Sequence, residues 1–299
     1  MLPAGKTRLD QRRECVLAGV EPGGRFLEIG PSHNPTLARR DGFDTRNADH
    51  LTRSGLVEKY GDHTDVDLEA IEDVDYVLIP GVPFIQCIDE QFDLILAAHV
   101  LEHTTSLIHF VNDCTGLLRP GGTLALILPD QRFCFDRFRE RSSLGSVIDA
   151  AAHAGPVHSA GTLTEFALYA TKRKGSISWG PGSGGAYEWV HGLDDARELV
   201  QASADQTYID VHHWVFTPHH LRLLLHDLAD TGHIALRESF FHDTVGNEFF
   251  LSLTRDGAGP PLPREDLVTL ADAERQSYGP ARFRPPGAGQ NSAHTADRR

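Results

Sequence analysis

Short, continuously apolar segments alternate with longer mixed segments along the first 130 residues. The apolar segments predict strands at 25–29, 45–48, 75–79, 92–97 and 123–128. A helix is predicted at 100–118, because the breaker sequence Arg119-Pro120-Gly121-Gly122 follows it. Strands without polar alternation are typical of a parallel sheet that is covered on both faces. The pattern therefore predicts an α/β fold.

The alternation of apolar and mixed segments stops over residues 131–213 and then resumes. Helices are predicted at 144–154 and 193–204, separated by a stretch rich in Gly and Ser. After the break, Thr217-Pro218 begins an apolar helix at 219–231, and strands follow at 233–241 and 248–253. We predict a Rossmann-like, seven-stranded, mostly parallel sheet with helices on both faces. Its core comprises residues 1–130 and 214–255, and a mainly helical insertion at 131–213 covers the active site.

Both ends of the chain are assigned more coarsely. Residues 1–24 have a helical pattern, and residues 35–41 predict a further short helix. Residues 256–299 hold many Pro and Gly and few large apolar residues, which predicts a flexible tail whose last fifteen residues are disordered.

The composition of the chain limits which partners and which cellular compartment we expect. The formal net charge of −14 disfavours a nucleic-acid partner, because phosphate binding needs clustered Lys and Arg. The four cysteines form no C-x-x-C pair, as expected in a reduced compartment. No apolar run approaches the roughly 18 residues that span a bilayer. We expect a cytoplasmic protein with no membrane partner, either a monomer or a homodimer.

Two motifs predict a nucleoside cofactor. A strand ends at Glu28-Ile29-Gly30, where glycine lets a ligand approach the backbone. Asp49 ends the next strand, about twenty residues later, where a carboxylate can accept hydrogen bonds from both hydroxyls of a ribose. The chain has no G-x-G-x-x-G at this turn, which disfavours a dinucleotide.

A third block carries a family resemblance. Phe92-Asp93-Leu94-Ile95, His99-Val100-Leu101-Glu102-His103 and Leu117-Leu118-Arg119-Pro120-Gly121-Gly122 resemble class I S-adenosylmethionine-dependent methyltransferases of the type 11 group. The segments 27–35, 129–136, 212–218 and 241–250 are similar to a bacterial branch that modifies sugars and glycans. The resemblance implies S-adenosylmethionine as cofactor, S-adenosylhomocysteine as product, and methyl transfer to a saccharide hydroxyl.

The resemblance also implies which residues bind the cofactor. They are Glu28, Gly30, Pro31, Ser32, Asn34, Asp49, His50, Leu51, Ala98, His99 and Glu102. Many relatives place an acid after the third strand to bind the adenine amine, but this chain has Ile79-Pro80-Gly81 there. Either a backbone group or Asp75 would have to take over that contact.

Transfer to a hydroxyl is helped by a general base, and histidine suits this role near neutral pH. The candidates are His99, His103, His153, His158, His191, His212, His213 and His242. Asp130 follows the fifth strand at the edge where α/β folds bind ligands. We expect the catalytic residues among His153, His158, Asp130 and His103.

A metal site is not predicted. His99 and His103 are spaced like zinc ligands on a helix, but no third ligand is evident nearby. Mg²⁺ stays open as an additional cofactor, since Asp130, Asp136, Asp243 and Glu248 carry the oxygen ligands that it prefers.

Two side-chain groups of the insertion bear on the acceptor. The arginines at 132, 137, 139 and 141 could steer an acidic acceptor, although salt bridges within an acidic chain are the favoured interpretation. Trp179, Trp189 and Trp214 slightly favour a saccharide, because sugar rings stack on aromatic faces.

Two other functions remain open. The same cofactor could serve a small natural-product hydroxyl, amine or carboxyl acceptor. A methyltransferase-like domain without activity, which binds a partner or ligand, is the third reading, and the intact Gly30, Asp49 and Glu102 argue against it.

Overall fold

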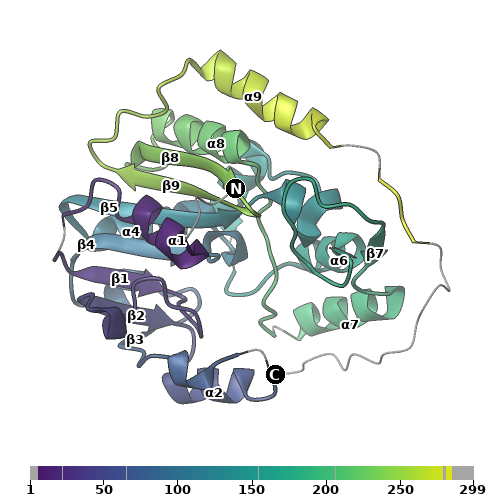
Figure 1. Cartoon of the computed structure of the whole chain (residues 1–299), viewed down its shortest axis with the longest axis horizontal. Helices are drawn as coiled ribbons and strands as arrows, with labels where there is room; N and C mark the ends of the chain where they lie inside the picture. Colours follow the sequence, from purple (N-terminus) through teal and green to yellow (C-terminus); the bar gives the residue numbers. More distant parts are fainter. Residues whose placement is uncertain are drawn as a thin grey trace.

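A single seven-stranded sheet organises the molecule (Figure 1). The computed structural model describes residues 6–21, 23–64, 66–153, 155–205, 207–278 and 281–284. The strands are β1 (Phe26–Ile29), β2 (Thr45–Asp49), β3 (Tyr76–Val77), β4 (Phe92–Ala98), β5 (Leu118–Pro129), β8 (Arg237–Val245) and β9 (Glu248–Thr254). Their order is β3-β2-β1-β4-β5-β9-β8. The pairs among β1 to β5 are parallel, whereas β9 runs antiparallel to both β5 and β8, so the predicted seven-stranded, mostly parallel sheet is confirmed.

Helices cover the sheet, and the sequence of β4 shows why. Leu94 and Leu96 belong to an apolar cluster with Cys15 and Val16 of α1 (Arg8–Val16). Ile95 belongs to the other cluster, together with α4 (Leu107–Leu117) and α8 (Pro218–Asp230). Successive side chains of a strand point to opposite faces, so a continuously apolar strand needs cover on both sides.

Helix α8 follows its sequence signal closely. Thr217 is the N-cap residue, and Pro218 occupies the first turn. Proline suits this position, because its missing amide proton would have had no partner within the helix. Leu221, Leu224, Leu225 and Leu228 are buried, which is the spacing of one helix face. The predicted helix at 219–231 is thus confirmed.

Other predicted elements need correction. The helix predicted at 100–118 is two elements: a 3₁₀ turn at Leu101–His103 and α4, whose N-terminus is capped by Ser106. Thr104 and Thr105 lie in this break and line the cavity that is described below. Of the helix predicted over 1–24, the described residues 6–21 contain α1, the predicted helix at 35–41 is only a 3₁₀ turn at Arg39–Asp41, and α2 (Arg53–Tyr60) was not predicted.

The insertion contains short helices and a small sheet of its own. It holds the 3₁₀ turns Gln131–Phe133 and Phe135–Phe138, the helices α5 (Leu144–His153), α6 (Ala160–Tyr169) and α7 (Leu193–Ala204), and the strands β6 (Thr171–Arg173) and β7 (Tyr187–Trp189). The strands β6 and β7 pair in antiparallel fashion. Val147 of α5 is fully buried in the main core, so the first part of the insertion packs as a layer of the core.

The segment after the last strand differs from the predicted flexible tail. It includes α9 (Arg264–Gln276), which lies beside α8 in Figure 1. Leu267 and Ala271 are buried, and Arg264 forms a bidentate ion pair with Asp227 of α8. Four-residue spacing of small and apolar residues forms a helix face that the overall Pro and Gly content conceals. The last fifteen residues, predicted to be disordered, lie outside the described residues.

The remaining elements are the 3₁₀ turn Leu68–Ala70 and the one-turn helix α3 (Phe84–Cys87). In the part of the chain that the structure describes, every helix is too short or too polar to cross a bilayer.

Candidate functional site

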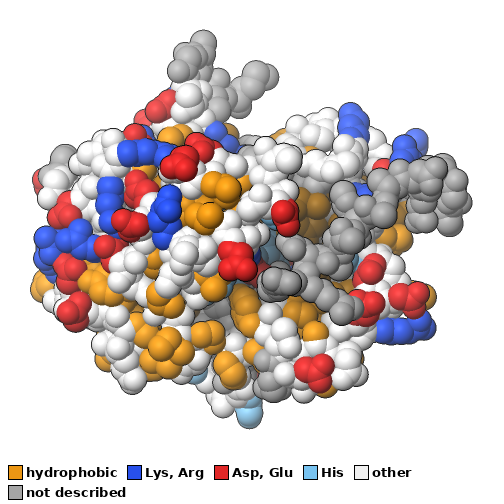
Figure 2. All heavy atoms as spheres, turned by 90° about the horizontal axis from the view of Figure 1, so that it is seen from below, with side chains coloured by type: hydrophobic (Ala, Val, Ile, Leu, Met, Phe, Trp, Pro, Cys, Tyr) orange, Lys and Arg blue, Asp and Glu red, His pale blue; other side chains and the backbone are white. Residues whose placement is uncertain are grey.

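A cavity of about 990 Å³ opens at the carboxyl ends of β1, β2 and β4. Its wall combines the turn after β1, Asp49 and His50 after β2, the loop after β3, and the segment 103–106, with Tyr208 and Asp210 from the insertion. Figure 2 shows histidine side chains within a recess near the centre of the face that it views, with carboxylates beside them. Ligands of open α/β sheets bind at this edge.

The backbone of the turn after β1 lies so close to Val100 that a side chain at Gly30 would clash with it. Gly30 has a φ of +66°, and a Cβ at this position would lie 2.7 Å from Cγ2 of Val100. Ser32 is also left-handed, with a φ of +50°. These constraints explain the glycine in the motif, since only glycine adopts this conformation without strain.

Glu28 fixes the shape of that turn. Its two carboxylate oxygens accept hydrogen bonds from the backbone amides of Thr36 and Leu37, at 2.7 and 2.8 Å. Burial raises the pKa of Glu28 to about 7, although these two amides favour the charged form. The side chain lines the cavity, but its oxygens are engaged with the backbone, so it positions the loop that the cofactor contacts.

Asp49 has a carboxylate oxygen with no partner among the described residues. Its Oδ1 accepts from the backbone amide of His50 at 2.7 Å and lies 2.6 Å from Nδ1 of that imidazole. Its Oδ2 is buried and makes no hydrogen bond. A buried carboxylate oxygen without a partner is costly, and a ribose hydroxyl from a bound nucleoside would satisfy it.

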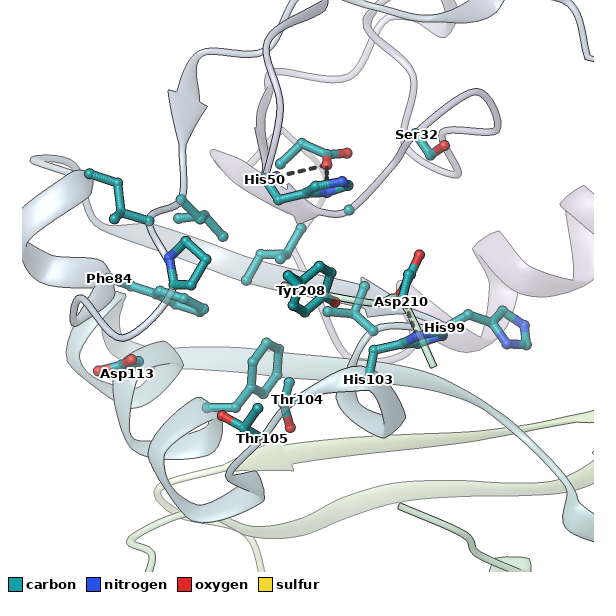
Figure 3. A pocket seen from close by; sticks show the side chains of 18 of the residues that line it. Ser32, His50, Phe84, His99, His103, Thr104, Thr105, Asp113, Tyr208 and Asp210 are labelled. Atoms are coloured by element: carbon teal, nitrogen blue, oxygen red, sulfur yellow. Dashed lines mark hydrogen bonds and ion pairs between the residues drawn. The ribbon is translucent and has the colours of Figure 1, made fainter. Parts of the chain in front are cut away.

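The position of Asp75 bears on whether it could take over the contact to the adenine amine. Asp75 does not line the cavity, because its carboxylate accepts from the backbone amide of Asn47 at 2.7 Å and pairs with Arg39. The acid that lines this end is Asp113 of α4. Burial raises its pKa, although the Phe84 amide donates a hydrogen bond to it. In Figure 3, Phe84 and Asp113 lie at one end of the cavity, and His99 and His103 lie at the other.

His99 lies after β4 in a left-handed conformation, with a φ of +55°. Its Nε2 is 2.6 Å from Glu248, and its Nδ1 is 3.3 Å from Glu102. Burial disfavours its charge, but these two carboxylates outweigh burial and raise its pKa to about 9. His99 therefore presents a cation to the cavity at neutral pH.

His103 and Asp210 form the opposite wall. Nδ1 of His103 lies 2.8 Å from Oδ1 of Asp210, and Lys59 approaches the other oxygen at 3.5 Å. Burial opposes the charge of His103, yet Asp210 raises its pKa overall. Figure 3 shows this pair, with Tyr208 between it and the Phe84 end.

The other expected catalytic residues lie outside the cavity wall. His153 is exposed, and its Nδ1 lies 2.9 Å from the carbonyl oxygen of Asp149. His158 is buried beside Tyr208, and burial lowers its pKa to about 4. Asp130 is fully buried and engaged by Arg132 and Thr244. Of the four expected residues, only His103 lines the cavity.

Most of the residues that we expected to bind the cofactor lie around this cavity. The following line the cavity: Glu28, Gly30, Pro31, Ser32, Asn34, Asp49, His50, Ala98 and His99. Leu51 and Glu102 do not line it. Glu102 is fully buried behind His99.

The arginines and tryptophans named in the sequence analysis do not line the cavity. Arg132 and Arg139 pair with Asp130 and Asp136, as the salt-bridge interpretation favours. Trp214 is buried in the core, and Trp189 stacks on Phe283. None of these side chains lines the cavity, so the tryptophans give no support to a saccharide.

Sequence reasoning missed Lys59, Tyr60, Asp113, Tyr208 and Asp210. No contiguous motif contains them. Asp210 lies two residues before the histidine pair His212-His213, which is the one signal that could have drawn attention to it.

Residues 62–126 match the family described as methyltransferase domain. The match spans β3, β4, α4 and most of β5, and the sheet ends in the antiparallel pair that the resemblance implies. This segment of the chain is similar to methyltransferase domains, and the cofactor that the similarity indicates is S-adenosylmethionine.

Searches for relatives of this methyltransferase domain found no curated protein that matches. Among solved structures, the glycopeptide N-methyltransferase MtfA is 9% identical, with a TM-score of 0.41 over 84% of this chain and 91% of that one. An O-methyltransferase family protein from Burkholderia thailandensis is 13% identical, with a TM-score of 0.39 over 84% and 57%. The CcbJ methyltransferase from Streptomyces caelestis is 15% identical, with a TM-score of 0.31 over 48% of this chain and 61% of its own length.

Proposed function

We propose that this chain transfers the methyl group of S-adenosylmethionine to a hydroxyl group of a saccharide. The observation that supports this proposal is a second carboxylate, Asp210. It lines the same cavity as Asp49, beside the partly exposed ring of Tyr208. Carboxylates accept hydrogen bonds from sugar hydroxyls, and an aromatic face packs against the apolar face of a sugar ring. The similarity of segments 27–35 and 241–250 to glycan-modifying methyltransferases supports the same acceptor.

The residues divide the cavity into four parts. Asp113 and Phe84 mark the adenine end, Asp49 faces the ribose, and the Gly30 turn with His99 borders the methionine. His103 and Asp210 then border the acceptor. Figure 3 shows Phe84 and Asp113 at the end of the cavity opposite His99 and His103, and the unpaired Oδ2 of Asp49 supports the ribose position.

Methyl transfer requires alignment more than activation by the protein. When bound, S-adenosylmethionine supplies a methyl group on a sulfonium, whose carbon–sulfur bond breaks as the acceptor oxygen forms its bond to carbon. The sulfur keeps the electron pair and leaves as the neutral thioether. The chain holds the acceptor oxygen in line with the carbon–sulfur bond, the carboxylate of Asp210 accepts the hydrogen bond of the acceptor hydroxyl, and the proton passes to water as the oxygen is methylated.

Two measurements test this function in sequence. Calorimetry with S-adenosylmethionine should show saturable binding, and no binding at millimolar cofactor would rule out every methyltransferase reading. Incubation with methyl-labelled cofactor and panels of mono- and oligosaccharides, amines, phenols and carboxylic acids then identifies the acceptor. Label on a saccharide that survives mild alkali is expected, because an ether resists alkali and a methyl ester does not. Label confined to amines, phenols or carboxylic acids would contradict the saccharide assignment.

A further inference from the structure

Three side chains that are distant in sequence meet behind the wall of the cavity. Glu102 and His103 belong to the 3₁₀ turn after β4, and His212 belongs to the segment that returns from the insertion to the core. One oxygen of Glu102 and one nitrogen of each imidazole all lie within 4.8 Å of one another. The rings of His103 and His212 meet edge to face, with centroids 4.6 Å apart.

Glu102 lacks the hydrogen bonds that a buried carboxylate requires. It is 0% exposed, and neither of its carboxylate oxygens has a hydrogen-bond partner in the part of the chain that the structure describes. The nearest cationic groups are Nδ1 of His99 at 3.3 Å and Nε2 of His212 at 3.9 Å. His99 is already held by Glu248 at 2.6 Å. The neighbouring imidazoles compensate the charge of Glu102, but a buried carboxylate that accepts no hydrogen bond in the described residues has room for a further partner.

Each histidine of the cluster is oriented by a carboxylate of its own. Nδ1 of His212 is 2.5 Å from Asp136, and Nδ1 of His103 is 2.8 Å from Asp210. Arg139 in turn holds Asp136 at 2.8 Å. A carboxylate on one nitrogen of an imidazole fixes the ring and makes the other nitrogen a better ligand, which is the usual surrounding of metal-binding histidines.

We propose that Glu102, His103 and His212 bind a divalent transition-metal ion of the zinc class. Two imidazoles and one carboxylate suit Zn²⁺, Co²⁺ or Fe²⁺, whereas Mg²⁺ prefers oxygen ligands. Ligand atoms at about 2.0–2.2 Å from an ion in tetrahedral geometry lie roughly 3.3–3.6 Å apart, so binding would draw the atoms of this cluster together by at most about 1.5 Å. The sequence predicted no metal site, and the spacing of His99 and His103 does not identify this cluster, because His99 faces Glu102 and Glu248.

The ion would have two consequences for the molecule. It would join the core turn at 101–103 to the segment 207–213 of the insertion, and so fix the position of Tyr208 and Asp210. It would also lie beside the cavity, because His103 is part of its wall. Metal binding itself requires neither the cofactor nor an acceptor, so it can be tested apart from the proposed function.

Metal content and Co²⁺ spectroscopy on the full chain test the site. The tag-free protein is stripped with chelator and titrated with Co²⁺, and the visible absorption bands of bound Co²⁺ should saturate at about one ion per chain. Zn²⁺ should then displace the Co²⁺ and abolish the bands. Failure to saturate, or saturation at several ions per chain with no change in the bands on adding Zn²⁺, would overturn the proposal.

Two ligand variants and a control locate the ion. Glu102→Gln and His212→Gln should each weaken Co²⁺ binding at least about 10-fold, whereas His158→Gln should leave it unchanged, since His158 is a buried histidine outside the cluster. Circular dichroism checks that each variant is folded. An equal loss in all three variants, or no loss in folded Glu102→Gln and His212→Gln, contradicts the assignment. If a ligand variant does not fold, the remaining one and the wild-type displacement experiment decide the question.

Discussion

The two walls of the cavity are built in different ways. The cofactor wall consists of short contiguous stretches after β1, β2 and β4, and backbone hydrogen bonds to Glu28 and the left-handed Gly30 set its shape. The acceptor wall joins segments about one hundred residues apart through the ion pair of His103 with Asp210, and the pair of His212 with Asp136 lies behind it. Backbone geometry is therefore decisive for one wall, and charge pairing for the other. Substitutions in the first should change cofactor binding, and substitutions in the second should change turnover.

Asp49→Asn should have the largest effect, on cofactor binding. The substitution removes the charge that faces the ribose, and a hydrogen bond to a charged group contributes about 1.5–3 kcal/mol. We expect S-adenosylmethionine to bind about 100-fold more weakly, as measured by calorimetry. Asp194→Asn on the exposed surface of α7 is the control, and equal affinity in the two variants would contradict the role of Asp49.

Glu28→Gln tests how the cofactor wall depends on pH. The folded-state pKa of about 7 lies above the ordinary value of 4.5, so the protonated form stabilises the fold and this contribution is lost as pH rises through 7. Each pKa unit corresponds to about 1.4 kcal/mol, so the contribution is at most about 3.5 kcal/mol. The free energy of unfolding of the cofactor-free protein should therefore fall more between pH 5 and 8 in the wild type than in Glu28→Gln. Parallel pH profiles in denaturant unfolding would show that Glu28 carries no such linkage.

Gly30→Ala and Gly42→Ala separate backbone strain from close approach. Both glycines have a left-handed φ, but only at Gly30 would a Cβ strike a neighbour, Val100 at 2.7 Å. A left-handed alanine costs about 1–2 kcal/mol at either site. Both variants should lose melting temperature, and only Gly30→Ala should also bind S-adenosylmethionine at least about 10-fold more weakly. A loss of affinity in Gly42→Ala of the same size would refute this distinction.

Asp210→Asn should act on turnover and spare the cofactor. The substitution removes the charge that holds His103 and accepts hydrogen bonds from the acceptor, so kcat for methyl transfer should fall about 10- to 100-fold. The dissociation constant of S-adenosylmethionine should change less than about two-fold, since the carboxylate of Asp210 pairs with His103 and Lys59 and not with Asp49. If cofactor affinity falls as much as kcat, the two walls do not act separately.

Asp113→Asn should have the smallest effect, on recognition of the adenine. A carboxylate can accept a hydrogen bond from the adenine amine, and its amide counterpart should weaken S-adenosylhomocysteine binding about 10-fold. S-inosylhomocysteine, which has no amine, should be affected less. Equal weakening of both ligands would mean that Asp113 acts only through its bond to the Phe84 amide.

The fold was largely predictable because its signals are local. The glycine turn, the apolar strands and the Thr217-Pro218 helix start each depend on neighbouring residues, and they match β1, β4 and α8. The missed elements have weaker patterns. In α2 only Leu56 is buried, and α9 presents its buried face within a region rich in Pro and Gly.

The sequence by itself determined the cofactor wall, since Gly30, Asp49 and His99 follow strands whose parallel order brings their ends to one edge. Only the tertiary structure decided that Asp210 faces His103, that Asp113 stands near the adenine end, and that His212 approaches Glu102. These contacts depend on how the insertion returns to the core, across a separation of about one hundred residues. A local sequence pattern specifies backbone conformation over a few residues, whereas pairings between distant segments depend on the packing of the whole chain.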